Sequence, residues 1–234
     1  MVKTSLVDYP GRVAAAFFFR GCNLRCPYCY NAELATGSLP DKNAASAAEV
    51  IAHLDRRKKI LTGLVLSGGE PLLSPAAAEL VSAARRLGYA IKLDTNGCCP
   101  GLLRSFLASP DTCPDYVALD VKTAPARYGL LEPQPGAGDG SGAGAAITES
   151  IAVVSALPPE KREFRTVLVP GLVTADDVRE IARLLPRDGA WYFSPFRNGR
   201  CLDPAYDALA PYTDSQAEAL VDLARETIPG ARLR

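Results

Sequence analysis

The sequence lacks any excess of charge of one sign. Its 26 basic and 26 acidic residues give a formal net charge of zero over 234 residues. General nucleic-acid binders and acidic-membrane binders attract their ligands with a strongly charged surface. The composition therefore argues against both classes of partner, and we expect a protein that binds neither nucleic acid nor membrane.

Long hydrophobic runs are also missing. The longest early run, residues 13–19 (VAAAFFF), is far too short to span a bilayer. The first residues, MVKTSLVDYPGR, contain no apolar segment typical of a secretory signal. Seven cysteines without such a signal favour a cytoplasmic protein, because cysteine clusters in a reducing compartment more often bind metal than form disulfides.

Short apolar runs alternate along the chain with longer helical patterns rich in Ala and Leu. This alternation predicts β/α units on a parallel sheet. Six such units in roughly 200 residues fit a partial barrel better than a full eight-unit barrel, and a doubly wound open sheet is the rival. We expect strands at 13–19, 63–67, 90–95, 116–121, 164–169 and 191–196, and helices at roughly 44–59, 75–87, 101–108, 147–156, 174–185 and 214–227.

One segment breaks this rhythm. Residues 132–146, EPQPGAGDGSGAGAA, are rich in glycine and are typical of a flexible surface insertion. The β/α pattern resumes after it, so we interpret residues 1–234 as one domain that carries this insertion.

Three cysteines, Cys22, Cys26 and Cys29, lie close together with the spacing Cys-x3-Cys-x2-Cys. A structural zinc site normally has four ligands, and a ferredoxin-type cluster also uses four cysteines. No fourth cysteine or histidine lies nearby, and the single histidine, His53, is expected at the surface of a helix. Three thiolates on a four-iron cluster would leave one iron open to another ligand. The alternative is a zinc site completed by a distant cysteine: Cys98, Cys99, Cys113 or Cys201.

Residues 67–71, SGGEP, follow one predicted strand and precede a helix. Gly68 and Gly69 would let the backbone approach a ligand closely. The Glu70 carboxylate is suited to pairing with a ligand ammonium group. Taken alone, the motif can equally be a plain turn, and it lacks the Gly-Lys-Ser/Thr ending of a phosphate loop.

The two motifs together, in this order and about 40 residues apart, resemble the radical S-adenosylmethionine (SAM) superfamily. Nearly the whole chain is similar to the glycyl-radical-enzyme activating proteins, in particular those that activate anaerobic ribonucleoside-triphosphate reductase. The resemblance rests on KTSLVDYPG (3–11), GCNLRCPYCYN (21–31), LSGGEPLL (66–73), KLDTNG (92–97), ALDVK (118–122), FRTVLVPG (164–171) and FRNGRCLDP (196–204).

The resemblance implies a partial (βα)6 TIM-like barrel of the radical SAM type. It implies an oxidoreductase that cleaves SAM reductively at a [4Fe-4S] cluster and, through a 5′-deoxyadenosyl radical, generates a glycyl radical on a partner enzyme. Anaerobic ribonucleotide reductase is the partner expected first, with flavodoxin or ferredoxin as the electron donor. The alternatives are pyruvate formate-lyase or another glycyl radical enzyme as partner, a small-molecule enzyme of the carboxy-deazaguanine synthase type, or a non-catalytic iron–sulfur or zinc scaffold.

The resemblance also assigns roles to individual residues. Cys22, Cys26 and Cys29 would hold the cluster. Two carboxylates at adjacent strand ends would repel each other, which is why a lysine or a monovalent cation is expected between Asp94 and Asp120. Tyr30 stands where many members have histidine, and we expect no loss of cluster binding from it. The further expected SAM contacts are Gly68, Gly69 and Glu70 for its amino group, Tyr28 for its adenine, Asp94, Thr95, Asp120 and the catalytic Lys122 around its carboxylate, and Arg165.

Overall fold

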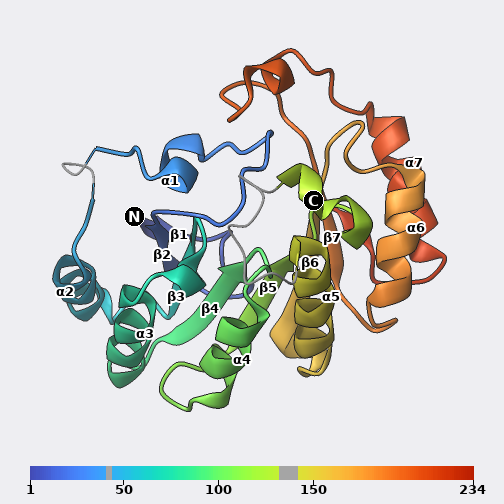
Figure 1. Ribbon diagram of the computed structural model, residues 1–234. Helices are drawn as coiled ribbons and strands as arrows, with labels where there is room; N and C mark the ends of the chain where they lie inside the picture. The colour runs from blue at the N-terminus through green and yellow to red at the C-terminus, as the bar shows by residue number, and fades with distance from the viewer. Residues whose placement is uncertain (41–43, 132–141) are drawn as a thin grey trace. The chain divides into compact units, whose positions relative to one another are not determined.

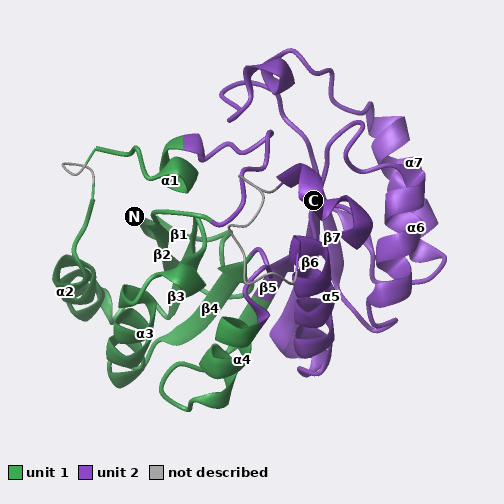
Figure 2. Ribbon diagram, in the orientation of Figure 1, with its two compact units in different colours: residues 1–22, 33–95, 101–117 green, residues 23–32, 96–100, 118–234 purple. Residues whose placement is uncertain are grey.

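The computed structural model describes residues 1–40, 44–131 and 142–234 (Figure 1). The chain divides into two compact units, shown in green and purple in Figure 2. Unit 1 comprises residues 1–22, 33–95 and 101–117, and unit 2 comprises residues 23–32, 96–100 and 118–234. The interpretation of the chain as a single domain stays a prediction.

The strands form a mostly parallel sheet in which their order follows the chain from β1 to β8. A doubly wound sheet reverses its strand order at a switch point. The sequential order therefore excludes the doubly wound rival. The six strands expected from the sequence are all present, and β1 and β8 are additional.

Unit 1 contains the first four strands. β1 (Val2–Ser5) pairs antiparallel with β2 (Ala14–Phe19), and β3 (Gly63–Gly68) and β4 (Ala90–Thr95) continue the sheet in parallel. β5 (Tyr116–Asp120) begins in unit 1 and ends in unit 2.

Unit 2 contains the last three strands, β6 (Arg162–Leu168), β7 (Trp191–Pro195) and β8 (Arg232–Leu233), which pair in parallel. Trp191 and Phe193 of β7 are fully buried and alternate with more accessible residues. This alternation is what a strand with one face on the core requires.

The stretch KTSLVDYPG has a structural role in unit 1. The Ser5 hydroxyl accepts hydrogen bonds from the backbone N–H groups of Val7 and Asp8, each at 3.2 Å. The turn brings Tyr9 into the core, where it is 4% exposed. A Cβ on Gly63, the first residue of β3, would lie 2.8 Å from the Tyr9 ring, so glycine is required there. This stretch thus closes the amino end of the strands, opposite the end at which SGGEP lies.

The helices of this part of the chain are α1 (Ala32–Thr36), α2 (Ala47–Arg57), the 3-10 turn η2 (Pro71–Leu73), α3 (Ala76–Arg86) and α4 (Pro100–Ala108). Helices α2 and α3 lie side by side (Figure 1). The surface position expected for His53 is wrong. His53 is only 8% exposed because the inner face of α2 carries it to a contact of 3.1 Å between its Nε2 and the Lys3 carbonyl oxygen.

Unit 2 contains η3 (Pro125–Leu131), α5 (Gly142–Ser155), η4 (Pro159–Lys161), α6 (Ala175–Leu184), η5 (Pro204–Asp207) and α7 (Asp214–Arg225). Capping boxes start α6 at Thr174 with Asp177 and α7 at Thr213 with Gln216. Helices α6 and α7 pack side by side (Figure 1). In the described parts of the chain, no helix combines the length and the apolar character needed to cross a membrane.

Helix α5 begins at Gly142, earlier than the expected start at residue 147. The first part of the expected insertion, residues 132–141, lies outside the described residues, whereas residues 142–146 are helical. A Cβ on Gly144 would lie 2.4 Å from the carbonyl oxygen of Pro125, so this glycine permits a close approach between α5 and η3. Glycine lowers helix propensity, which is why the pattern concealed this first turn.

Candidate active site

The Gly-Gly-Glu turn at the end of β3 is bonded to the backbone that leads into the cysteine motif. The N–H of Gly69 donates to the Phe19 carbonyl and the N–H of Glu70 donates to the Gly21 carbonyl, each at 2.8 Å. A Cβ on Gly69 would lie 1.9 Å from the Gly21 oxygen. A Cβ on Gly68, which has φ of 107°, would lie 2.5 Å from the Phe19 nitrogen. Both glycines are therefore required because the backbone of residues 18–21 of the same chain lies against them, whether or not a ligand binds there.

Glu70 is fully buried and hydrogen-bonded within unit 1. Its Oε1 accepts a hydrogen bond from the Thr95 hydroxyl at 2.9 Å and another from the backbone N–H of Leu72 at 3.2 Å. The structure therefore brings the predicted residues Glu70 and Thr95 together. Since Oε1 caps η2, the residue stabilises the turn, and its contact with a SAM amino group stays a prediction.

Lys92 and Asp94 form a buried ion pair on β4. Lys92 Nζ lies 2.5 Å from Asp94 Oδ1, and the two side chains are 3% and 12% exposed. Residues two apart on a strand face the same side of the sheet, so the pattern Lys-x-Asp was the signal for this pair. Sequence reasoning did not select Lys92.

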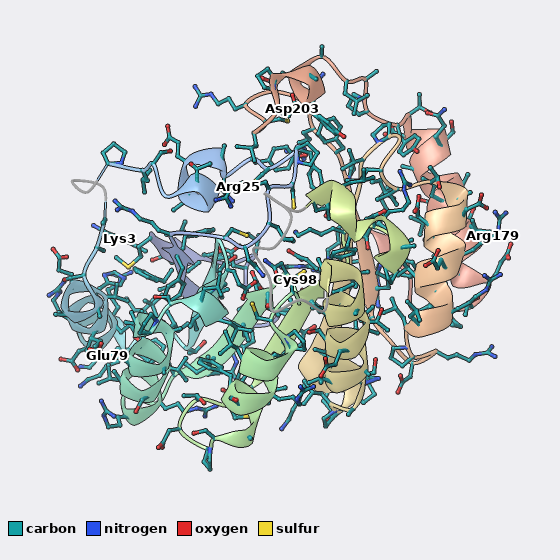
Figure 3. The ribbon with its side chains drawn as sticks, in the orientation of Figure 1. Lys3, Arg25, Glu79, Cys98, Arg179 and Asp203 are labelled. Atoms are coloured by element: carbon teal, nitrogen blue, oxygen red, sulfur yellow. The ribbon has the colours of Figure 1, made fainter. Side chains whose placement is uncertain are left out.

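The segment between Cys26 and Cys29 in unit 2 forms a turn, in which the N–H of Cys29 donates to the Cys26 carbonyl at 3.0 Å. Its partner is the segment after β7. The N–H of Asp203, labelled in Figure 3, donates to the Pro27 carbonyl at 2.9 Å. The N–H of Arg197 donates to the Tyr30 hydroxyl at 2.7 Å.

Tyr30 therefore has a definite position in unit 2. Its ring stacks on Phe196, with ring centroids 6.3 Å apart and planes inclined by 16°. Its hydroxyl accepts a hydrogen bond from the Arg197 N–H. Along the chain, Tyr30 follows Cys29, whereas Pro27, which accepts from Asp203, precedes it. Residues 196–204, part of the recognised sequence pattern, thus hold the cysteine turn at two points.

Asp120, at the end of β5, lies between two cations. Arg165 Nε is 2.7 Å from its Oδ1 and Lys122 Nζ is 3.4 Å from its Oδ2. Burial raises the pKa of Asp120, but the positive charges of Arg165 and Lys122 outweigh this and lower it to about 2. Burial lowers the pKa of Lys122, and the carboxylate of Asp120 reverses this to hold it well above its ordinary value.

Asp94 and Asp120 thus each have a basic partner of their own, Lys92 for the first and Arg165 with Lys122 for the second. The expected repulsion between two carboxylates is therefore no argument for a monovalent cation. That cation stays a prediction from the resemblance alone.

A cavity of about 250 Å³ opens beside Asp120 in unit 2. Three of the other predicted SAM contacts line it, so the structure brings together four of the residues that the sequence selected. Its wall consists of Tyr28, Asp120, Lys122, Arg165, Thr166, Val167 and Ser194.

Cys98 (labelled in Figure 3) and Cys99 lie beside Asn23 in unit 2. Asn23 Nδ2 donates to the Cys98 carbonyl and to Cys99 Sγ, each at 3.4 Å, and Asn23 Oδ1 accepts from Asn96 Nδ2 at 2.8 Å. These amides join the residue after Cys22 to the DTNG stretch. Sequence reasoning missed Asn23, although its place inside the cysteine motif was a signal.

The three motif cysteines suit an iron–sulfur cluster chemically. Each of the seven cysteines is a thiol, and thiolates are the ligands that iron–sulfur clusters use. Within residues 1–40, 44–131 and 142–234, no three His, Cys, Asp or Glu side chains converge on one position suited to a single metal ion. A cluster distributes its thiolates over separate irons, so it does not need such convergence.

Comparison with known proteins identifies the family. A family profile described as the Radical SAM superfamily matches residues 17–139, which include both motifs. This match covers more than half of the chain, and the chain belongs to the radical SAM superfamily. It is an enzyme of this type, and the predicted α/β fold class is confirmed.

Three curated relatives refine the comparison. A provisionally named glycyl-radical enzyme activating enzyme of Methanocaldococcus jannaschii is 27% identical over 238 residues, covering 100% of this chain and 94% of the relative. The pyruvate formate-lyase-activating enzyme of Clostridium pasteurianum is 33% identical over 122 residues, covering 50% and 48%. The 7-carboxy-7-deazaguanine synthase of Methanopyrus kandleri is 30% identical over 136 residues, covering 49% and 51%. The chain therefore spans about half the length of the last two relatives.

Solved structures agree on the fold. The structure of TYW1 with a lysine–pyruvate adduct bound superposes with a TM-score of 0.61 at 13% identity, covering 92% of this chain and 73% of that one. At this identity the likeness concerns the fold alone. The resemblance to glycyl-radical activating proteins is confirmed by the relatives, whereas a particular closeness to the anaerobic reductase activators is not.

Proposed function

We propose that this protein is a radical SAM activase that generates a glycyl radical on a partner enzyme. The observation that carries the proposal is the junction in unit 1 between the two family motifs. The Gly-Gly-Glu turn is hydrogen-bonded to Phe19 and Gly21, the residues that lead directly into Cys22. A structural turn alone would not require both motifs in one place.

The residues fit a [4Fe-4S] cluster held by Cys22, Cys26 and Cys29. When bound, the cluster supplies the electron with which SAM is cleaved to methionine and a 5′-deoxyadenosyl radical. The contribution of this chain is to bind and orient SAM. Lys122 and Arg165 offer positive charge to its carboxylate, and the ring of Tyr28 offers an apolar wall beside them.

The hydrogen atom would be taken from a glycine of a protein substrate. Anaerobic ribonucleotide reductase is the first candidate partner, and pyruvate formate-lyase or another glycyl radical enzyme is the next. A cytoplasmic one-electron donor such as flavodoxin or ferredoxin would provide the reducing equivalent.

The test is anaerobic reconstitution with iron and sulfide. We expect about four irons per chain and formation of 5′-deoxyadenosine that depends on dithionite. The Cys26→Ser variant should lose both. Cys113→Ser is the control, because Cys113 lies outside the motif and its thiol contacts the neighbouring Pro114 carbonyl. The absence of 5′-deoxyadenosine from the wild-type protein would refute the proposal.

The partner can be identified by electron paramagnetic resonance. Each candidate glycyl radical enzyme is incubated with the reconstituted protein, SAM and reductant. A glycyl doublet on one candidate and not on the others names the substrate. No doublet on any candidate, despite SAM cleavage, would contradict activase function.

A small-molecule reaction of the carboxy-deazaguanine synthase type is the second candidate. Its support is the similarity to the Methanopyrus kandleri synthase over about half of the chain. Formation of a 7-carboxy-7-deazaguanine product in the presence of SAM, without a glycyl radical on any partner, would favour it. One zinc and no iron after strictly anaerobic purification would instead favour a non-catalytic scaffold.

A further inference from the structure

Tyr28 buries a hydroxyl group that has no hydrogen-bond partner among the described residues. The residue is only 4% exposed, and its Oη is inaccessible to solvent and unpaired. Buried hydroxyl groups in native proteins are nearly always hydrogen-bonded, because desolvation without a partner is costly. This exception therefore needs a physical explanation.

Other tyrosines with buried hydroxyl groups have partners. The Tyr9 hydroxyl donates to the Ile91 carbonyl and the Tyr89 hydroxyl to the Leu54 carbonyl. The Tyr128 hydroxyl accepts a hydrogen bond from the backbone N–H of Lys122 at 2.9 Å. The fold can thus satisfy a buried phenol, and Tyr28 stands apart from these three.

Tyr28 lines the cavity of about 250 Å³ in unit 2. Two cations, Lys122 and Arg165, and one carboxylate, Asp120, share its wall, so the wall carries one net positive charge. The Thr166 hydroxyl is already used, since it donates to the Val121 carbonyl and accepts from the Trp191 ring nitrogen. The cavity therefore suits a ligand group with one negative charge and acceptor oxygens.

A carboxylate meets both requirements, because it carries one negative charge and accepts several hydrogen bonds. A hydrogen bond from a hydroxyl to an ionised acceptor is stronger than one between neutral groups. A donor with no protein partner loses nothing when the ligand arrives. The Tyr28 hydroxyl could therefore donate to such a ligand without giving up a hydrogen bond within the protein.

We propose that the Tyr28 hydroxyl donates a hydrogen bond to the carboxylate of SAM and so selects ligands that carry this group. The inference rests on the proposed function. It gives Tyr28 a role beyond the apolar contact expected for its ring, and it makes this residue a determinant of ligand specificity.

The experiment compares Tyr28→Phe with Tyr89→Phe in the anaerobically reconstituted holoenzyme. The dissociation constants of SAM and of decarboxylated SAM are measured by equilibrium dialysis, and thermal unfolding of each full-length chain is measured without ligand. Tyr89 is the matched control, because its hydroxyl is buried and hydrogen-bonded to the Leu54 carbonyl.

For Tyr28→Phe we expect the dissociation constant of SAM to rise about tenfold, as for loss of one charge-assisted hydrogen bond. That of decarboxylated SAM should match the wild-type value. The Tm without ligand should be unchanged or higher, because the variant removes an unpaired buried group. Tyr89→Phe should show the reverse, a lower Tm with unchanged SAM binding.

Three results would overturn the inference. The first is equal SAM affinity in Tyr28→Phe and wild type. The second is an equal loss of affinity for SAM and for decarboxylated SAM. The third is a lowered Tm of Tyr28→Phe, which would show that water or protein already satisfies the hydroxyl. Wild-type holoenzyme that binds no SAM would refute both this inference and the proposed function. Normal SAM binding with an unaffected Tyr28→Phe variant would refute the inference alone.

Discussion

The candidate residues of unit 1 and those of unit 2 are in different physical states. In unit 1, Glu70 is fully buried and hydrogen-bonded to Thr95 and Leu72, and Lys92 is paired with Asp94 out of solvent. In unit 2, the Asp120 side chain is 31% exposed beside a cavity. The first set of residues is bonded within the fold, and the second set borders a cavity.

This difference separates stability from ligand binding, two requirements that a sequence motif alone does not distinguish. A motif residue can be required because the fold fails without it, or because the ligand is lost without it. We expect substitutions in the unit 1 set to reduce stability first, and substitutions in the unit 2 set to reduce SAM binding first.

Gly69→Ala should destabilise the protein most. The added Cβ would lie 1.9 Å from the Gly21 carbonyl oxygen, so the backbone must move. The expected loss is roughly 3 kcal/mol in the free energy of unfolding, measured in urea. Gly101→Ala in α4 is the control, since nothing lies within 4 Å of its added Cβ. If both variants were equally stable, the close approach in unit 1 would be unimportant.

Glu70→Ala should cost about 2 kcal/mol of stability, because it leaves the Thr95 hydroxyl and the Leu72 N–H buried without this acceptor. Urea unfolding of the chain without ligand measures it. The control is Glu79→Ala, at an exposed position of α3 labelled in Figure 3. Unchanged stability together with lost SAM binding would show that Glu70 serves the ligand and not the fold, which would contradict the division.

Lys122→Met should show the opposite behaviour. Asp120 keeps Arg165 as its partner at 2.7 Å, so stability should change by less than about 1 kcal/mol. The dissociation constant of SAM should rise about tenfold, which corresponds to roughly 1.4 kcal/mol. Equilibrium dialysis and urea unfolding on the same preparation separate the two effects. A large loss of stability would show that Lys122 is structural.

The charge of Asp120 predicts a pH dependence. Its pKa in the folded protein is about 2, below the ordinary 3.8, so the unfolded chain binds the proton more readily. The stabilisation is complete above about pH 5 and is lost as the pH falls toward 2, and we expect roughly 1 kcal/mol after solvent screening. The stability difference between wild type and Asp120→Asn should therefore shrink below about pH 4. A difference that is constant from pH 3 to pH 7 would contradict the ion-pair assignment.

Tyr30→Phe should have the smallest effect. It removes the acceptor for the Arg197 N–H at an exposed position and keeps the ring stacked on Phe196, so the expected loss of stability is about 0.5 kcal/mol. The reconstituted variant should also lose its cluster absorbance faster in the presence of a chelator. Tyr30→Ala should enlarge both effects, because stacking is lost as well. Unchanged rates in both variants would show that residues 196–204 do not stabilise the cysteine turn.

Sequence patterns predicted the elements well, for reasons visible in the strands. Buried runs such as residues 63–67 and 116–121 are bounded by turn residues, and each became a strand near the expected limits. The start of α5 at Gly142 was missed because glycine in its first turn lowers helix propensity, while Gly144 serves close packing against Pro125, which no local pattern reveals. His53 was misjudged for the same reason, since its partner Lys3 is far away along the chain.

The candidate site shows the same division. Asp120, Lys122 and Arg165, which line the cavity with Tyr28, were found because each stands in a recognisable motif. The other lining residues, Thr166, Val167 and Ser194, were not selected. Lys92 and Asn23 were missed, although both stand inside quoted motifs. Their importance depends on partners, Asp94 for the first and the Cys98 carbonyl for the second.

The sequence by itself determined the order of the β/α units, the family motifs and the types of ligand that the cysteines and charged residues can offer. These properties depend on residue type and local spacing, which the chain carries before it folds. Only the tertiary structure decided that Glu70 is hydrogen-bonded within unit 1, that Tyr30 holds the segment after β7, and that Tyr28 lines a charged cavity while its buried hydroxyl has no partner among the described residues. Such outcomes depend on which distant groups meet and which are left unsatisfied, and those encounters exist only in the folded chain.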